Sequence, residues 1–295
     1  MKSGTVAVVG RANAGKSTLV NVLVGEKVSI VSPKPQTTRD RIYGVLTTED
    51  YQIVFEDTPG IYKASSLLNG RMQKTARDTA EQTDLVLFVI DGHDGLKEED
   101  LKEACKFSEV SVPFLVALTK VDIMPKEKIP QTLVTLSERV KADEIIPVSA
   151  RKGKNVDKLK QLLISYLPEG GYVFDPDAVS DKSERFMIGE IMREKILLKF
   201  DKEIPHGVAV TVNDFHKRED GIYEVDIDVV CEKPNHKAII IGKQGKALKE
   251  VNTFARQSME KFLGAKVFLT TFVKVKENWR DRPDLLKQYG YSEDK

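Results

Sequence analysis

The sequence is poor in several features that would indicate a particular class of protein. Its 295 residues include only two cysteines, one tryptophan and four histidines. Cys105 and Cys231 stand far apart and match no metal-binding spacing, so we expect free thiols, a cytoplasmic location and no zinc site. No apolar run approaches the roughly 18 residues needed to span a bilayer. Because the chain runs from Met1 almost directly into an apolar strand pattern, no cleavable signal peptide is expected.

The chain also lacks net charge, which is +1 overall, but this average conceals two opposite blocks. Residues 173–232 hold 8 Lys/Arg against 15 Asp/Glu, a balance of −7, and residues 233–282 hold 12 against 4, a balance of +8. A basic block of this density is either a solvated face or a surface for phosphate backbones. The length suggests roughly two domains of about 150 residues each.

What the sequence does contain is a phosphate-binding pattern near its start. Residues 6–9 are a short apolar run typical of a buried parallel strand, and residues 10–17 read G-R-A-N-A-G-K-S before an amphipathic helix pattern. Gly10 and Gly15 allow backbone angles at which N–H groups converge on phosphates. Lys16 adds a charge for the β- and γ-phosphates, and Ser17 offers a hydroxyl to Mg²⁺. The strand and helix on either side distinguish this P-loop from a chance glycine turn.

A second phosphate-related motif follows a polar, proline-containing loop over residues 27–41. Residues 42–46 and 51–55 read as a β-hairpin, and the second strand leads into D-T-P-G. Asp57, at the carboxyl end of a strand, suits Mg²⁺ binding, and the N–H of Gly60 suits a γ-phosphate contact. D-T-P-G is also a common turn sequence, but its place after a strand and downstream of a P-loop favours the functional interpretation.

Strands and helices then alternate, which predicts a mostly parallel sheet with helices on both faces. Apolar strands are expected over residues 85–90, 113–118 and 144–148, and helices over residues 69–82, 98–107 and 126–140. Asn155 is expected to cap the next helix. Two polar motifs, T-K-V-D and S-A-R, follow the last two strands. Since ligand loops gather at the carboxyl ends of parallel strands, these motifs belong to one site.

These two motifs point to guanine. Asp122 can accept from both N1–H and the exocyclic amine, a donor pair that adenine lacks. Lys120 can lie along the ring, and the N–H of Ala150 can donate to O6. The predicted nucleotide-binding set is Gly10, Asn13, Ala14, Gly15, Lys16, Ser17, Thr18, Asp57, Gly60, Thr119, Lys120, Asp122, Ser149, Ala150 and Arg151.

The second half of the chain predicts a smaller α+β domain. Residues 167–182 have the Pro, Gly and Asp content of a linker, and Ser183 or Asp181 can cap a helix over residues 184–200. The order α-β-β-α-α-β, with G-K-Q-G between two helices, resembles the KH fold in its bacterial arrangement. Such a loop admits a nucleic-acid backbone. The predicted RNA-binding set is Ile241, Gly242, Lys243, Gln244, Gly245, Lys246 and Lys249.

Taken together, nearly the whole chain resembles the Era family of ribosome-associated GTPases. The resemblance rests on G-R-A-N-A-G-K-S, P-Q-T-T-R-D-R, D-T-P-G, T-K-V-D, S-A-R, residues 193–210, I-I-I-G-K-Q-G and residues 273–291. It implies a GTPase domain over residues 1–168, a linker over 169–182, a KH-type RNA-binding domain over 183–276 and a carboxyl-terminal tail over 277–295 that packs on the KH domain.

The resemblance also implies an activity and partners. The protein would hydrolyse GTP to GDP and phosphate, bind small-subunit ribosomal RNA near its 3′ end, close to the anti-Shine–Dalgarno sequence, and act in maturation of the small subunit. It would be monomeric and associate loosely with the inner membrane face. Thr38 would be the switch threonine that joins Ser17 and Asp57 as an Mg²⁺ ligand, with Thr37 as the alternative. Lys16, Thr38 and Gly60 would be the catalytic residues.

One position departs from Ras-like GTPases. Ile61 follows D-T-P-G, where a glutamine that orients the attacking water would be expected. Hydrolysis then depends on another group or on a bound K⁺, for which Asn13 is the expected ligand; Asn13 otherwise serves as a turn residue. A second interpretation of the whole chain also stays open, in which the KH-like domain binds a protein or a membrane instead of RNA.

Overall fold

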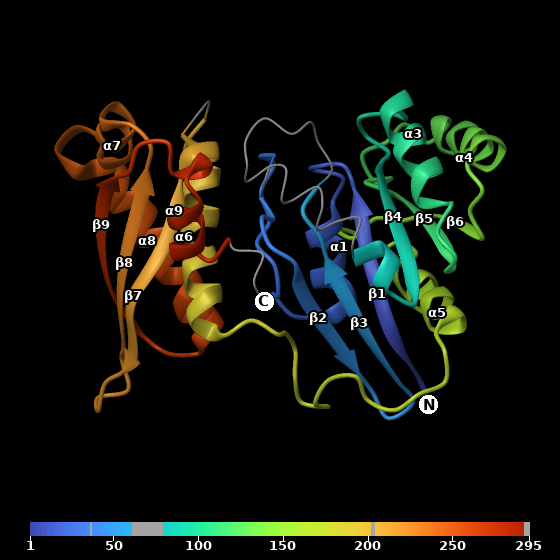
Figure 1. Ribbon diagram of the computed structural model, residues 1–295, viewed down its shortest axis with the longest axis horizontal. Coiled ribbons are helices and arrows are strands. Elements are labelled where there is room, and N and C mark those ends of the chain that lie inside the picture. The colour runs from blue at the N-terminus through green and yellow to red at the C-terminus, as the bar shows by residue number, and fades with distance from the viewer. Residues whose placement is uncertain (36, 61–78, 202–203, 292–295) are drawn as a thin grey trace. The chain divides into compact units, whose positions relative to one another are not determined.

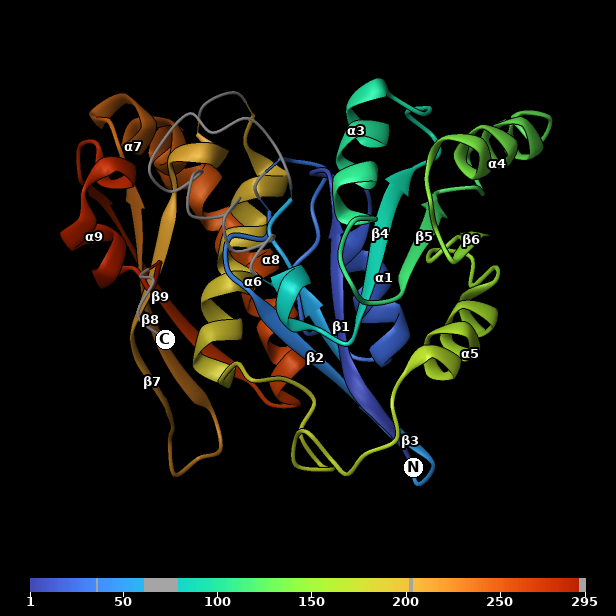
Figure 2. The same ribbon diagram turned by 45° about the vertical axis from the view of Figure 1, so that its right-hand side comes forward.

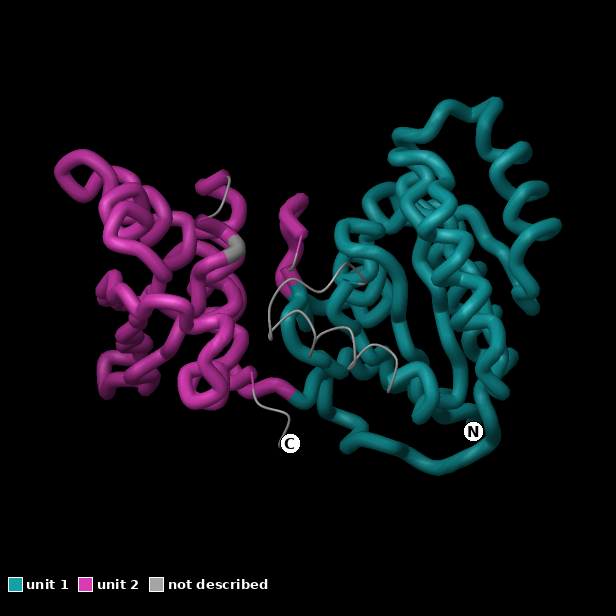
Figure 3. The backbone as a smooth tube through the Cα atoms, turned by 45° about the horizontal axis from the view of Figure 1, so that its top comes forward, with its two compact units in different colours: residues 1–29, 38–64, 69–181 teal, residues 30–37, 65–68, 182–295 magenta. Residues whose placement is uncertain are grey.

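A computed structural model describes residues 1–35, 37–60, 79–201 and 204–291 of the chain. Ile61 and residues 69–78 of the helix predicted over residues 69–82 lie outside these ranges, and residues 79–82 are helical. The chain divides into two compact units (Figure 3). The first contains most of the chain up to Asp181, and the second contains Lys182 onward together with the short segment Ile30–Thr37.

A six-stranded sheet forms the centre of the first unit (Figure 1). Its strands lie in the order β2-β3-β1-β4-β5-β6; β2 and β3 form the antiparallel hairpin, and the remaining neighbours run parallel. The strands are β1 (Lys2–Gly10), β2 (Ile42–Thr47), β3 (Tyr51–Asp57), β4 (Leu85–Asp91), β5 (Phe114–Thr119) and β6 (Glu144–Pro147). The helices are α1 (Lys16–Val24), α3 (Glu98–Phe107), α4 (Lys128–Arg139) and α5 (Val156–Tyr166). The predicted fold class is therefore confirmed for this unit.

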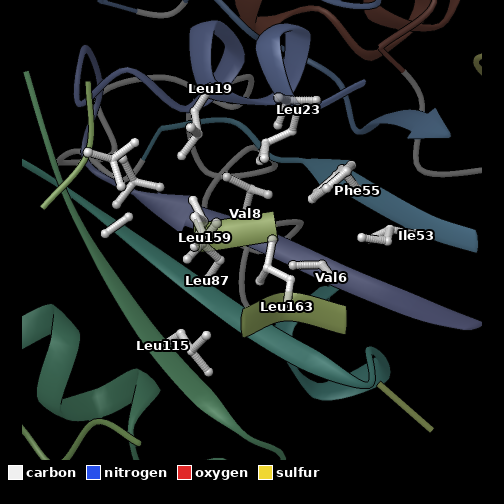
Figure 4. Packing of buried hydrophobic residues seen from close by; sticks show 14 of the residues in the cluster. Val6, Val8, Leu19, Leu23, Ile53, Phe55, Leu87, Leu115, Leu159 and Leu163 are labelled. Atoms are coloured by element: carbon white, nitrogen blue, oxygen red, sulfur yellow. The ribbon is translucent and has the colours of Figure 1, made fainter. Parts of the chain in front are cut away.

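The central strands are apolar at nearly every position because both faces of the sheet are covered. Val8 of β1 packs with Leu19 of α1 and Leu159 of α5 in the core shown in Figure 4. Its neighbour Val9 points to the other face, where it shares a second core with Leu136 of α4. Full burial of each such side chain stabilises the fold by about 1.5–3 kcal/mol. These two cores hold the strand ends, and the loops that follow them, in fixed positions.

The predicted linker runs along the first unit, with a turn at residues 175–178, and pairs with its edge strand. Val45 of β2 donates its N–H to the carbonyl of Val179 at 2.9 Å, and Gly44 pairs with Ser180. Farther back, the side chain of Gln52 bonds to the backbone of residues 173–174. Pairing of this kind satisfies the backbone groups that an edge strand would otherwise expose.

The second unit is a three-stranded sheet in the order β7-β8-β9, with β7 antiparallel and β9 parallel to β8. Figure 2 shows α6 and α8 on one side of this sheet and α9 on the other. Its elements are α6 (Glu184–Lys199), β7 (Ala209–Lys217), β8 (Tyr223–Cys231), α7 (Pro234–Ile241), α8 (Lys246–Leu263), β9 (Val267–Val275) and α9 (Pro283–Gln288), with 3₁₀ turns at Pro205–Gly207, Lys243–Gly245 and Trp279–Asp281. The order α-β-β-α-α-β agrees with the prediction.

The carboxyl-terminal tail packs within this second unit. The Trp279 ring is fully buried, and its Nε1 donates to the carbonyl of Gly207 at 2.9 Å. Tyr289 and Tyr291 lie against the same ring. Arg280 adds a two-pronged ion pair with Glu232, at 2.6 and 3.1 Å. These contacts hold the tail residues Trp279, Arg280, Tyr289 and Tyr291 in the second unit.

Of two predicted helix caps, the structure confirms one and contradicts the other. Ser183 caps α6, since its hydroxyl accepts from the N–H of Phe186 at 3.2 Å. Asn155 precedes α5 as predicted, but the prediction that it caps this helix is wrong. Its backbone is left-handed (φ 59°), and its Nδ2 donates to the carbonyl of Pro147 at 2.7 Å. The side chain therefore ties the start of α5 to β6 and does not accept from the helix N–H groups.

Within the described ranges, no helix combines the length and the apolar content that a membrane span requires.

Candidate nucleotide site and nucleic-acid groove

The phosphate-binding loop joins β1 to α1 and depends on glycine at its two ends. Gly10 has φ 143°, and a Cβ added there would lie 2.3 Å from the carbonyl oxygen of Val89. Gly15 has φ 95° and immediately precedes α1. Asn13, between them, is also left-handed with φ 63°. Most side chains other than asparagine and aspartate are disfavoured at these angles, so glycine and asparagine at these positions favour a loop that curves around an anion at the α1 amino terminus.

Lys16 lies inside the loop with only 5% of its surface exposed. Its Nζ donates to the carbonyls of Gly10 and Arg11, both at 3.0 Å. Burial lowers the pKa of Lys16 to about 8, and the charge of Asp57 opposes this shift. An arriving phosphate chain would supply further negative charge and would favour the charged lysine.

Three predicted Mg²⁺ ligands converge beside Lys16. The hydroxyls of Ser17 and Thr38 lie 2.8 Å apart. Asp57 at the end of β3 is fully buried, and no described group donates a well-aligned hydrogen bond to either carboxylate oxygen. Burial raises the pKa of Asp57, against the effect of Lys16. A buried carboxylate with free oxygens beside two hydroxyls fits the oxygen ligands that Mg²⁺ takes in nucleotide sites, where water and phosphate complete its shell.

The structure separates the two candidate switch threonines. Thr38 shares its hydroxyl with Ser17, as just described. Thr37 instead donates its hydroxyl to the carbonyl of Lys34 at 2.6 Å and accepts from the hydroxyl of Ser32 at 2.8 Å. Thr38 is therefore the one placed with the Mg²⁺ ligands.

The D-T-P-G segment packs against the phosphate loop. Thr58 donates its hydroxyl to the carbonyl of Val8 at 2.8 Å. A Cβ on Gly60 would lie 2.6 Å from Cα and 2.7 Å from N of Ala12. Glycine is required here because the two backbones approach too closely for any side chain. This packing places the backbone of Gly60 directly against the phosphate loop.

The base-binding motifs meet at the ends of β5 and β6. Thr119 donates to the carbonyl of Ala14 at 2.6 Å, which fastens this loop to the phosphate loop. The Ser149 and Asp122 side chains are 2.7 Å apart, and this contact positions the carboxylate. Lys120 is left-handed (φ 57°) and forms an ion pair with Asp91 at 2.5 Å. Ala150 and Arg151 follow Ser149 in the same loop, and Thr18 lies in the first turn of α1.

Two acidic residues near the site were missed by the sequence reasoning. Asp91 ends β4 and holds Lys120, and its own Oδ1 accepts from the N–H groups of His93 and Asp94. Asp100 in the first turn of α3 binds Arg11 of the phosphate loop at 3.3 Å. The place of Asp91 at the carboxyl end of an apolar strand was a usable signal, whereas nothing local to Asp100 pairs it with Arg11.

The second predicted site lies between α7 and α8. Gly242 (φ 73°), Gln244 (φ 54°) and Gly245 (φ 72°) are all left-handed, so the chain turns sharply between the helices. A Cβ on Gly242 would lie 2.6 Å from that of Ala247. Ile241 ends α7 half-buried, while the exposed residues of the turn and of the α8 start include Lys243, Gln244, Lys246 and Lys249, followed by the exposed Glu250.

A groove of about 340 Å³ continues from this turn along α8 to β9. Its lining adds Asn252, Thr253 and Arg256 to the predicted Lys249. The Oδ1 atom of Asn252 is buried and accepts no hydrogen bond within the described ranges. Residues 249, 252, 253 and 256 share one helix face, a spacing that could have been found in the sequence. The groove offers positive charge and one side-chain amide, a lining suited to a single-stranded nucleic acid.

Comparison with known proteins gives matches in both halves. Residues 5–120 match the family model described as "50S ribosome-binding GTPase", and residues 203–280 match "KH domain". The chain is 48% identical over 290 residues to GTPase Era of Clostridium botulinum strain Okra, covering 98% of each, and 45% identical over 291 residues to GTPase Era of Clostridium kluyveri, covering 99% of each.

Two solved structures match over nearly the full length. The first is a single-residue variant of Aquifex aeolicus Era bound to GDP·AlF₄⁻, at 38% identity and TM-score 0.93, covering 99% of this chain and 100% of that one. The second is Era with MgGDPNP and nucleotides 1506–1542 of 16S ribosomal RNA, at 38% identity and TM-score 0.94, covering 99% of each.

Proposed function

This chain belongs to the Era family of GTPases, and we propose that it uses GTP binding and hydrolysis to control its binding to the 3′ region of small-subunit ribosomal RNA during maturation of that subunit. The observation that supports the proposal is that one chain carries both a P-loop whose Ser17 and Thr38 hydroxyls meet beside Asp57 and a groove with basic residues next to a G-x-x-G turn. The Era complex with 16S ribosomal RNA, similar to this chain over 99% of its length, supports the choice of RNA.

The nucleotide site would act by positioning and by charge. The loop N–H groups and Lys16 would hold the β- and γ-phosphates. Ser17, Thr38 and Asp57 would hold Mg²⁺, which neutralises phosphate charge when bound. Gly60 would donate its N–H to the γ-phosphate, so that loss of this group on hydrolysis removes a contact to D-T-P-G. Loss of the γ-phosphate would also weaken the Mg²⁺ binding that would hold Thr38 near Ser17.

We also propose that K⁺ assists hydrolysis. Ile61 cannot orient water, and a monovalent cation held by the side-chain oxygen of Asn13 would supply positive charge between the β- and γ-phosphates. The position of Asn13 at the exposed tip of the phosphate loop supports this assignment.

The alternative, in which the KH domain mainly binds a protein or a membrane, lacks comparable support. The exposed lysines around the G-x-x-G turn and the open amide in the groove match nucleic acid better. The predicted cytoplasmic location, peripheral membrane association and monomeric state stay predictions.

The RNA part of this proposal is tested by reversing charge at the turn. Lys243→Asp with Gln244→Asp places two carboxylates where a phosphate backbone would pass, so affinity for single-stranded RNA from the 16S 3′ end should fall at least ~100-fold. The matched control is Lys261→Asp with Gln257→Asp, which changes the same residue types on the exposed part of α8 outside the groove. Basal GTP hydrolysis should stay near wild type in both. Equal RNA affinity in the two double variants would move the RNA site elsewhere.

A further inference from the structure

The sheet of the second unit has a face that the helices α6 and α8 do not cover. On β8, Val225, Ile227 and Val229 point into the core. The alternate residues must therefore point to the opposite face. Parallel pairing with β9 places these alternate residues beside partners on the same face: Glu224 beside Phe268, Asp226 beside Thr270 and Asp228 beside Phe272.

Near Asp228, this face of the sheet is covered by other parts of the chain. Asp228 is only 7% exposed and pairs with Lys274 at 2.5 Å. Figure 2 shows α9 of the tail on this side of the sheet. The tail therefore covers the sheet near Asp228.

The rest of this face, toward Glu224 and Phe268, is exposed to solvent. Phe268 is 55% exposed and Phe272 is 53% exposed. Glu224 and Asp226 form no ion pair with any described residue, although Asp226 accepts a long contact from Asn213 at 3.4 Å. We call Glu224, Asp226, Phe268 and Phe272 the acidic aromatic face.

Single exposed apolar residues are ordinary, but this arrangement is more specific. Phe268 lies beside Glu224, and Phe272 lies one pair beyond Asp226, so the two rings on the edge strand and the two carboxylates form one mixed patch of aromatic surface and negative charge. Glu224 and Asp226 belong to the acidic block of residues 173–232. No residue of that block was placed in the nucleotide site or in the RNA groove.

We propose that the acidic aromatic face binds an extended, arginine-containing segment of a protein partner. A guanidinium can stack on a phenylalanine ring while it donates to a neighbouring carboxylate, a combination that lysine matches less well. Phe268 and Phe272 are four residues apart, roughly 13 Å along a strand. Arginines four residues apart in an extended segment have the same spacing. A phosphate backbone would be repelled by the two carboxylates.

The experiment uses the full chain and a labelled peptide of alternating arginine and threonine, with a glutamate–threonine peptide as its counterpart. Glu224→Gln with Asp226→Asn removes the two charges, and Phe268→Ser with Phe272→Ser removes the rings. The controls are Glu219→Gln with Asp220→Asn, which removes equal charge in the β7–β8 hairpin, and Leu198→Ser with Phe254→Ser, two apolar residues of similar exposure on α6 and α8. Retained RNA binding would show that each variant is folded.

Each of the two face variants should bind the arginine peptide at least ~10-fold more weakly than wild type, a loss of about 1.4 kcal/mol. The controls should bind as wild type, and the glutamate peptide should not bind. Failure of the wild type to bind the arginine peptide would overturn the proposal, as would an equal loss in the charge control. Loss of RNA affinity in the phenylalanine variant, with peptide binding kept, would make the face a nucleic-acid surface and also overturn it.

Discussion

At the scale of single residues, the choice of purine depends on one carboxylate held in place by its neighbours. Ser149 contacts Oδ1 of Asp122 at 2.7 Å, which leaves the other carboxylate lone pairs for the base. The Asp122→Asn variant exchanges one acceptor for a donor. GTP affinity should fall at least ~10-fold, since a charge-assisted contact contributes about 1.5–3 kcal/mol. Xanthosine triphosphate, which presents a 2-oxo group, should bind better than it does to wild type. Competition binding with both nucleotides measures this, and an unchanged ranking would refute the role of Asp122.

The potassium proposal also belongs to this scale. Hydrolysis should be faster in K⁺ than in Na⁺ at equal ionic strength, because the smaller Na⁺ fits the same ligand distances poorly. The Asn13→Ala variant should lose this difference while keeping GDP affinity. Since Asn13 is left-handed (φ 63°), alanine also adds backbone strain, and Asn13→Gly separates the two effects. Loss of the difference in both variants supports ligation by the side chain. Equal wild-type rates in the two salts would leave a group supplied by RNA or protein as the better explanation.

At the scale of elements, a side chain of α1 holds the first residues of the loop that leads to β2. Asn21 of α1 donates to the carbonyl of Ser29 at 2.8 Å and accepts from the N–H groups of Val28 and Ser29, both at 3.0 Å. One side chain thus replaces three backbone contacts in a segment without regular structure. Removing it leaves buried backbone groups unpaired.

The Asn21→Ala variant should therefore lose about 2–4 kcal/mol of unfolding free energy, from roughly 1 kcal/mol or more for each lost contact. The Asn21→Asp variant keeps the acceptor for Val28 and Ser29 and loses only the donor, so it should be intermediate. Denaturant unfolding of the three proteins checks this order. A fully stable Asn21→Ala protein would mean that water replaces these contacts without cost.

The elements also show what the sequence can and cannot predict. Apolar runs such as residues 85–90 predicted buried parallel strands correctly, because both faces of the sheet demand the same residue types. The G-K-S and G-K-Q-G patterns could be recognised in the sequence because each requires a particular backbone conformation. The ion pair between Arg11 and Asp100 was not readable, since 89 positions separate the partners and no local pattern couples them. Asn155 misled because asparagine suits both a helix cap and a left-handed turn.

At the scale of the whole molecule, the chain builds separate hydrophobic cores in its two units. Those of the first unit surround the six-stranded sheet, and that of the second joins α6 and α8 to the three-stranded sheet. The nucleotide-binding residues belong to the first unit, while the single tryptophan, Trp279, is fully buried in the second. Tryptophan fluorescence therefore reports on one unit, and far-UV circular dichroism reports on both.

This difference predicts how ligands change unfolding. A ligand that binds only the folded state stabilises it by about 2.7 kcal/mol at 100 times its Kd. GDP with Mg²⁺ should raise the unfolding midpoint of a circular dichroism transition and leave the Trp279 fluorescence transition nearly unchanged. Single-stranded RNA should raise the midpoint of the Trp279 fluorescence transition and of the circular dichroism component that coincides with it, and should leave the component stabilised by GDP unchanged. The Lys243→Asp, Gln244→Asp protein should lose the RNA effect and keep the GDP effect, because only the groove is altered. An equal shift of both transitions by GDP would show instead that the two units unfold as one cooperative body.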